Sequence, residues 1–186
     1  MIDNWYLSIL TYNHKSNMGT NKKIPSPYEW AGGVDKFEKL TDVFYVKVLK
    51  DEILEPVFRH MSPEHSKHVA HFLAETLMGP KFYSKEFGDD ALRHMVGKHI
   101  GKKLKEEQRK RWVELLLESA DEVGLPDDPE FRSTFVAHLE WGSRVAVINS
   151  QLEENPVTDQ DQIPEWGWGE VKGPFEVVGS LFHKDK

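Results

Sequence analysis

The chain has 186 residues, of which 39% are hydrophobic and 30% charged, and its formal net charge is −7. These values are typical of a soluble globular protein with one domain and extensions, and the acidic balance disfavours non-specific nucleic-acid binding. The absence of cysteine excludes disulfides, thiolate metal ligands and cysteine nucleophiles, and it fits a reducing cytoplasm. Residues 5–12 are the only apolar stretch near the start, and they are too short to cross a membrane.

The first fifty residues divide into an irregular segment and two helices. Residues 1–26 are expected to form a leader without regular structure. A short helix around residues 28–31 should be stopped by Gly32-Gly33, the strongest backbone break in this half of the chain. Residues 34–49 then place apolar side chains at helical spacing, which predicts an amphipathic helix with Tyr45 at the edge of its apolar stripe.

A third main helix is predicted between two proline-containing breaks. Ser62 is a favourable N-cap with Pro63 at the first helical position, and Gly79-Pro80 should end the helix near residue 78. After it, residues 80–104 are predicted to be loops around a short helix at 89–96. At 100° per residue, one face of the main helix carries His65, Val69, Phe72, Leu73 and Thr76.

Two long helices complete the expected domain. The first spans residues 105–123, and the basic cluster at 102–111 is interpreted as its solvated face because Glu106 and Glu107 interrupt it. The second begins at Asp128. Residues 152–186 contain three prolines and several glycines and are predicted to form an irregular tail. The sequence thus predicts an all-α domain over residues 27–151, with about five main helices.

Three residues in this domain have the chemistry of a ligand pocket around iron. His99 offers an imidazole nitrogen and lies in a glycine-rich stretch between a short helix and a long one. Tyr45 and Trp112 each combine a large apolar body with one hydrogen-bond donor. A histidine facing apolar and aromatic side chains suits haem iron, and His94 is a rival ligand. Taken alone, Tyr45 or Trp112 would be interpreted as ordinary core packing.

A non-haem metal site is the weaker alternative. His71 and Glu75 have the spacing that carboxylate-bridged metal sites use in helical bundles. Such a site requires matched pairs on other helices, and none is evident in the sequence. For His65 and His68, a histidine satisfied within the core or a pocket is about as plausible as a metal ligand.

At these residues the chain resembles the truncated haemoglobins of the second group, which are globins with two helices packed over two. The resemblance covers about residues 27–151. Its motifs are Gly32-Gly33, Phe44-Tyr45, Phe58, Phe72-Leu73, the run Gly79-Pro80-Lys81-Phe82-Tyr83-Ser84, His99 and Trp112. His99 precedes Trp112 by thirteen positions, as the proximal histidine precedes the buried tryptophan in that family. This spacing favours His99 over His94.

The resemblance implies haem b as the cofactor. His99 would be the proximal iron ligand, Tyr45 and Trp112 would be hydrogen-bond donors on the distal side, and Phe58 would stack on the porphyrin. His65 would lie at the distal gate, either as a polar gate or as a sixth iron ligand. Val69 and Phe72 would line the distal and inner walls of the haem pocket. The expected haem contacts are Tyr45, Phe58, His65, Val69, Phe72, His99 and Trp112.

The implied function is binding of O2, NO or another small diatomic ligand, for redox chemistry or sensing. NO dioxygenation and peroxidase-like activity stay open. The expected partners are an unidentified reductase and a second copy of the chain. The alternative is a haem-free interaction or sensing module with a globin fold. It is suggested by the segment between Phe87 and His99, which is longer than usual in the family, and by the Trp166-Gly167-Trp168-Gly169 tail. That tail is more simply interpreted as packing on its own domain.

Overall fold

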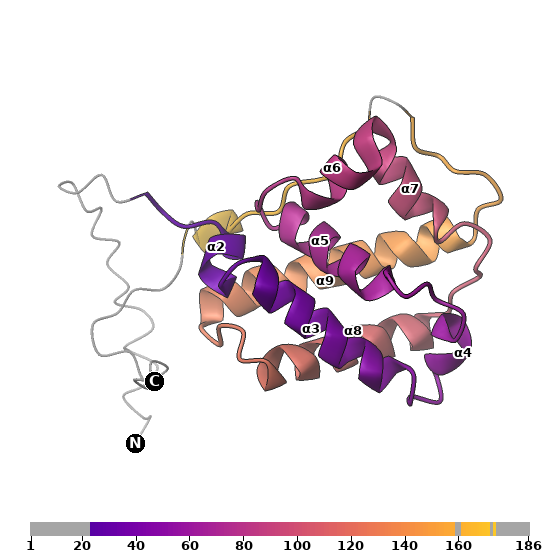
Figure 1. The fold of residues 1–186 in the computed structure, drawn as a ribbon, viewed down its shortest axis with the longest axis horizontal. Coiled ribbons are helices and arrows are strands. Elements are labelled where there is room, and N and C mark those ends of the chain that lie inside the picture. Colours follow the sequence, from indigo (N-terminus) through magenta and orange to yellow (C-terminus); the bar gives the residue numbers. More distant parts are fainter. Residues whose placement is uncertain (1–22, 159–160, 172, 174–186) are drawn as a thin grey trace, which may run out of the picture.

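The computed structural model describes residues 23–158, 161–171 and 173, and within these ranges all regular structure is helical (Figure 1). The long helices are α3 (Val34–Val48), α5 (His65–Thr76), α8 (Glu106–Glu122) and α9 (Pro129–Ser150). The short helices are α2 (Pro27–Ala31), α4 (Glu55–Phe58), α6 (Phe82–Phe87) and α7 (Ala91–Gly97), with 3₁₀ turns η1 (Gly88–Asp90) and η2 (Gly169–Val171). The all-α prediction is confirmed.

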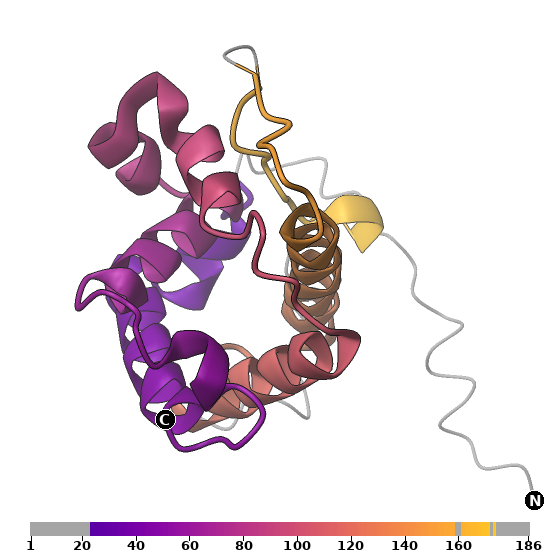
Figure 2. The same ribbon diagram turned by 90° about the vertical axis from the view of Figure 1, so that its right-hand side faces the viewer.

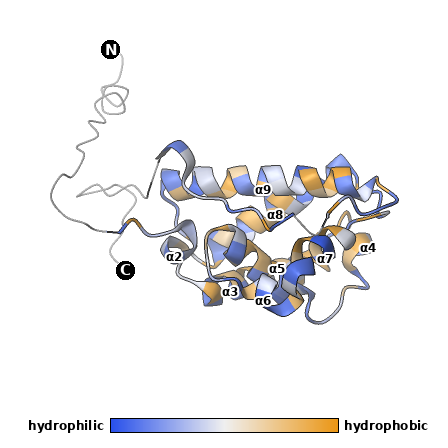
Figure 3. Ribbon diagram, turned by 90° about the horizontal axis from the view of Figure 1, so that it is seen from above, coloured by the Kyte–Doolittle hydropathy of each residue, from blue (hydrophilic) through white to orange (hydrophobic). Residues whose placement is uncertain are grey.

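The four long helices form two pairs. α3 packs against α5 and against α8, and α8 packs against α9. Figure 2 shows α3 and α5 on one side and α9 on the other, with α8 between them at the base. Hydrophilic and hydrophobic positions alternate along α8 and α9 in Figure 3, as expected of amphipathic helices. This is the two-over-two arrangement that the family resemblance implies.

The core forms from the apolar stripes of these helices. On α3 the residues at helical spacing are all buried: Phe37, Leu40, Phe44 and Val48. On α9, Phe131 and Phe135 stack with ring centroids 5.6 Å apart. Because fully burying an aromatic or large aliphatic side chain contributes roughly 2 kcal/mol, the stripes supply most of the driving force for folding. This packing fixes the positions from which Tyr45 and Trp112 project.

Side-chain N-caps mark the starts of α2 and α9, but not the start of α5. Ser26 accepts a hydrogen bond from the Glu29 amide and Asp128 from the Phe131 amide, so both are N-caps. The predicted start of α5 at Pro63 is wrong by two residues. The carbonyl of Ser62 instead accepts from the amide of His65, forming a turn, and no side chain caps the first turn of α5.

Two further predictions from the sequence need correction. The segment that forms α6 is predicted to be a loop, and no element is predicted at residues 55–58, but α4 and α6 are short helices of fewer than seven residues. The basic cluster at 102–111 is not wholly a solvated face. The Arg109 side chain is only 2% exposed, and its guanidinium pairs with Glu106 at 2.7 Å and Glu140 at 3.0 Å. A buried guanidinium is stable here because carboxylates compensate its charge.

The end of α5 requires a close approach between two helices. A Cβ on Gly79 would lie 2.5 Å from the carbonyl oxygen of Ala74 and 2.7 Å from the ring of Tyr28, so only glycine fits. The preceding residue, Met78, has φ of +67°, a left-handed conformation that favours glycine. Met78 is also the residue that replaces the first glycine of the pair usual in the resembled family.

The described part of the tail packs back onto the helical domain. In Figure 1 it runs from the end of α9 past α7 and α6 towards α2. Asn155 Nδ2 donates to the carbonyl of Arg93 near the start, and the Trp166 amide donates to the carbonyl of Thr76 further on. Trp168 is buried, and its indole N–H donates to the carbonyl of Pro25 at 2.7 Å. Residues 1–22 of the predicted leader lie outside the described residues, and the division at residues 27 and 151 stays a prediction.

No helix in the described ranges is both long and apolar enough to span a bilayer.

His138 is a buried histidine that the tail covers. It lies on α9 with 3% of its surface exposed, and its ring meets Trp166 edge to face at 5.7 Å. Its Nδ1 atom is buried without a hydrogen-bond partner in the described structure. Burial lowers the pKa of His138 from 6.5 to about 4. The folded chain therefore holds this ring in its neutral form in mildly acidic solution.

Because of His138, we expect the free energy of unfolding to decrease as the pH falls from 6.5 to about 4. Above pH 6.5, His138 should have no such effect. In that window the unfolded chain binds a proton on the imidazole that the folded chain excludes. The contribution of His138 between pH 7 and pH 5 is about 2 kcal/mol. Denaturant unfolding at both pH values measures it. His138→Phe should lose this part of the dependence, whereas His60→Gln, at an exposed position, should keep it. Equal pH dependence in wild type and His138→Phe would contradict the assignment.

Candidate functional site

Three side chains predicted for the site lie in direct contact. Tyr45 projects from α3, Phe58 ends α4 and His65 begins α5. The Tyr45 hydroxyl and His65 Nε2 are hydrogen-bonded at 3.0 Å. The rings of Tyr45 and His65 meet edge to face with centroids 4.9 Å apart, and Phe58 lies 5.7 Å from Tyr45 and 5.9 Å from His65. We call Tyr45, Phe58 and His65 the distal cluster.

Trp112 reaches the distal cluster through the core. It projects from α8 onto Phe44 with ring centroids 5.3 Å apart, and Phe44 meets Tyr45 at 4.8 Å. Burial raises the pKa of Tyr45, and the nearby Trp112 indole opposes that rise. The phenol is therefore protonated at neutral pH. Tyr45 and Trp112 together supply one O–H and one N–H donor.

The His65 ring is neutral at ordinary pH. Burial lowers its pKa to about 4, and the charges of His68, His99 and Lys98 act in the same direction. A neutral imidazole has one N–H donor and one acceptor nitrogen.

His99 lies half-buried in the turn that follows α7. Its Nδ1 atom is 3.0 Å from the backbone carbonyl oxygen of Met95. Because a carbonyl can only accept, Nδ1 carries the proton. Burial lowers the pKa of His99, against the opposing effect of the Met95 hydrogen bond, and Lys102 lowers it further. The ring is a neutral imidazole, and its Nε2 lone pair has no hydrogen-bond partner among the described residues. This is the form that iron binds.

The rival histidine, His94, is engaged elsewhere. Its Nδ1 atom is 2.8 Å from the hydroxyl of Tyr83, and its ring stacks on Phe87 with centroids 3.9 Å apart. Both partners belong to α6, so α6 holds His94 on its own side. Both histidines have Nδ1 engaged and Nε2 without a hydrogen-bond partner among the described residues, so they differ in where the ring is held: Tyr83 and Phe87 hold the His94 ring against α6.

Val69 and Phe72, the two remaining predicted residues, lie on α5 away from the hydrogen bond between Tyr45 and His65. Val69 packs against the core and is half-buried. Phe72 is also half-buried, and it meets Tyr83 edge to face at 5.4 Å. The structure thus brings together the distal cluster with Trp112 behind it, and it places Phe72 nearer α6.

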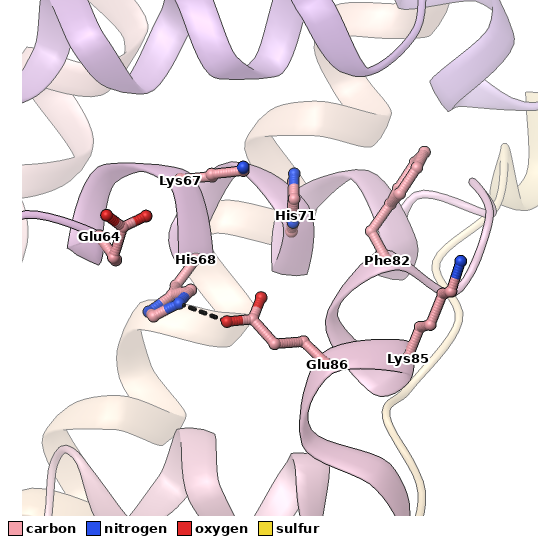
Figure 4. Close-up of a pocket in the computed structure, with 7 residues that line it drawn as sticks. All are labelled: Glu64, Lys67, His68, His71, Phe82, Lys85 and Glu86. Carbon is pink, nitrogen blue, oxygen red and sulfur yellow. Dashed lines mark hydrogen bonds and ion pairs between the residues drawn. The ribbon is translucent and has the colours of Figure 1, made fainter.

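A shallow cavity of about 430 Å³ lies on another face of α5 and α6 (Figure 4). It is lined by Glu64, Lys67, His68, His71, Phe82, Lys85 and Glu86. None of the seven predicted haem contacts lines it. Its histidines are occupied by carboxylates, with His68 Nε2 2.8 Å from Glu86 and His71 Nε2 3.0 Å from Glu38. His71 Nδ1 is buried without a partner, but no three histidines or carboxylates of the described residues converge there to hold a metal ion.

The non-haem metal alternative is not supported within the described residues. Glu75 accepts hydrogen bonds from the amide and hydroxyl of Ser84, so its carboxylate is used to hold α6 on α5. His71 pairs with Glu38. No group of three or more histidines and carboxylates in this part of the chain is arranged to hold a metal ion.

The donor set and the walls fit a haem group. Haem requires a neutral nitrogen ligand and an apolar surround, and His99 supplies the first. Phe58, Val69 and Trp112 pack against the core but are only partly buried, so they offer apolar surface to a flat ring system. Tyr45 adds a polar donor on the distal side. Fold and site together define a helical protein of the globin class.

Sequence reasoning missed two residues that orient the histidines. The Met95 carbonyl could have been found, because a histidine near the end of a helix commonly donates to the carbonyl one turn earlier. Tyr83, which holds His94, gave no such signal. Its contact depends on how α6 and α7 turn around η1, and periodicity does not report that turn.

Comparison with known proteins places the chain in a family. The family model described as "Bacterial-like globin" matches residues 26–142. The chain is 30% identical over 129 residues to the group 2 truncated hemoglobin YjbI of Bacillus subtilis, covering 69% of this chain and 93% of that protein. It therefore belongs to the bacterial-like globin family, and membership implies haem binding.

Solved structures support the same placement. The group II truncated hemoglobin from Bacillus anthracis superposes with a TM-score of 0.60 at 25% identity, covering 68% of this chain and 93% of that chain. The truncated oxygen-avid haemoglobin from Bacillus subtilis gives a TM-score of 0.56 at 28% identity, covering 66% and 99%. The resemblance to group II truncated haemoglobins inferred from sequence motifs is confirmed.

Proposed function

We propose that this chain binds haem b through His99 and holds O2, NO or CO on the opposite side, beside Tyr45 and Trp112. The observation that carries the proposal is the state of His99. Its Nδ1 proton is held by the Met95 carbonyl at 3.0 Å, so Nε2 is left as a neutral ligand nitrogen. The sequence has no cysteine for thioether attachment, which supports haem b rather than a covalently attached haem.

The bound haem would supply an iron atom that takes small diatomic ligands. The residues of this chain determine how such a ligand is retained. The Trp112 indole and the Tyr45 hydroxyl carry the two N–H and O–H groups of the distal side, and hydrogen bonds to a partly anionic acceptor are stronger than those to a neutral one. Phe44 is fully buried and Tyr45 is 3% exposed, so little water reaches the hydroxyl. Such retention favours redox chemistry or sensing over transport. The similar haemoglobin from Bacillus subtilis is described as oxygen-avid, which fits strong retention of O2.

An absorption spectrum of the purified protein tests the proposal, together with one variant. The protein should show a Soret band that shifts on reduction and addition of CO. Trp112→Phe keeps the aromatic packing on Phe44 and removes the indole donor, so O2 dissociation in stopped-flow should become roughly 10-fold faster.

Val46→Ala serves as the control for this variant. Val46 lies on the solvent side of α3 and is exposed, so O2 should dissociate from Val46→Ala at the wild-type rate. A protein that takes up no haem on reconstitution would reject the proposal in favour of the haem-free module. One of the two observations behind that alternative, the tryptophan-containing tail, no longer supports it, because Trp168 packs on its own domain.

A further inference from the structure

Tyr45 and His65 share one hydrogen bond, and its direction decides what the tyrosine can offer a ligand. The hydroxyl has a single proton. If that proton is donated to His65 Nε2, the oxygen presents only lone pairs to the distal side. If His65 donates instead, the hydroxyl proton is free for a ligand.

The surroundings of Tyr45 determine this direction. The side chain is only 3% exposed, and among the described residues His65 is the hydrogen-bond partner of its hydroxyl that could accept a proton. Trp112 has only a donor to offer. A buried O–H without an acceptor costs about 1–3 kcal/mol, so the arrangement in which Tyr45 donates to Nε2 is favoured.

The state of His65 allows the same direction. The ring is neutral because burial lowers its pKa to about 4, so one of its nitrogens is an acceptor. Its edge-to-face contact with Tyr45 and its contact with Phe58 hold Nε2 towards the hydroxyl. Its Nδ1 atom is not among the buried polar atoms that lack a partner, so it can carry the proton at the half-exposed edge of the site.

We propose that His65 is a positioning residue that keeps the hydroxyl proton of Tyr45, so that Trp112 alone donates to a diatomic ligand. This inference rests on the proposed haem function. Its consequence is specificity: a polar ligand such as O2 is retained by one donor instead of two, whereas CO, which depends little on hydrogen bonds, is unaffected.

A double-mutant cycle with two ligands tests the inference. His65→Leu keeps an apolar body of similar size and removes the acceptor, so Tyr45 is released to donate and O2 dissociation should become roughly 10-fold slower. CO dissociation should stay nearly unchanged. In a Tyr45→Phe background the same His65→Leu change should slow O2 dissociation no further, because the hydroxyl that it would release is absent.

The opposite pattern would overturn the inference. If Tyr45→Phe alone accelerates O2 dissociation strongly and His65→Leu does not slow it, the hydroxyl already donates to the ligand. A Soret band in all four proteins keeps this outcome distinct from failure of the haem proposal, because loss of haem binding would appear in the spectrum before any rate is measured.

The tautomer of His65 is a readout independent of ligand kinetics. In the diamagnetic ferrous CO complex, ¹⁵N–¹H correlation of the imidazole, assigned with His65→Leu, should show Nδ1 protonated and Nε2 unprotonated. A protonated Nε2 would refute the proposed direction of the hydrogen bond.

Discussion

Replacing His99 with alanine is expected to abolish the bond between this chain and the haem iron, whereas His94→Ala should leave it intact. The Met95 carbonyl holds the Nδ1 proton of half-buried His99, which leaves Nε2 to bind iron, whereas the Tyr83 hydroxyl at 2.8 Å and the Phe87 ring hold His94 against α6. Resonance Raman of the ferrous protein measures the iron–histidine stretch directly. The band should vanish in His99→Ala and persist in His94→Ala.

A rescue experiment separates loss of the ligand from loss of the fold. His99→Gly leaves space for exogenous imidazole, which should restore an iron–imidazole band if the pocket is otherwise intact. His94→Gly is the matched control and should not respond to imidazole. Loss of the band in His94→Ala with its retention in His99→Ala would reassign the proximal ligand to the histidine within α7.

Trp168→Ala is expected to lower the free energy of unfolding by about 3 kcal/mol, because it removes a large buried side chain. Trp168 is 9% exposed, and it ties the tail to the segment before α2 through Pro25 at 2.7 Å. Its carbonyl also accepts from the Thr134 hydroxyl on α9. Guanidinium unfolding followed by circular dichroism measures the loss.

Two variants divide this effect into its parts. Trp168→Phe keeps most of the buried apolar area and removes the indole donor, so it should cost about 1 kcal/mol. Glu165→Ala changes an exposed residue of the same segment and should stay within about 0.5 kcal/mol of wild type. If Trp168→Ala is no less stable than Glu165→Ala, the tail does not contribute to the fold.

The long helices were predictable because their signals are local. Phe37, Leu40, Phe44 and Val48 repeat at helical spacing, and all four are buried on α3. Asp128 followed by proline marks the start of α9 in any context, because the cap and the fixed proline φ act within one turn. These positions depend little on the rest of the molecule.

The short helices were not predictable in the same way. An isolated helix of four or six residues is unstable, so α4 and α6 exist only through their tertiary contacts. α6 is held by Tyr83, which is buried against Phe72, and by Ser84, which donates to Glu75 on α5. No propensity in the segment itself indicates these partners.

The candidate site divides along the same line. The spacing of His99 and Trp112 and the residue types at Tyr45 and Phe58 were sufficient to propose a haem pocket. Residue chemistry alone left the choice between His99 and His94 open, and it gave no sign that the Tyr83 hydroxyl engages His94 Nδ1. The hydrogen bond between Tyr45 and His65 had no signal in the sequence.

By itself the sequence determined the helical class, the amphipathic faces and the absence of cysteine chemistry, and it supplied the residues that we propose to hold haem. Each of these depends on residue type and on neighbours within a turn or two. The tertiary structure alone decided which polar groups pair: Tyr45 with His65, His94 with Tyr83, and Trp168 with Pro25. The physical reason is that each side chain has several acceptable partners, and the packing of whole helices brings only one of them within hydrogen-bonding distance.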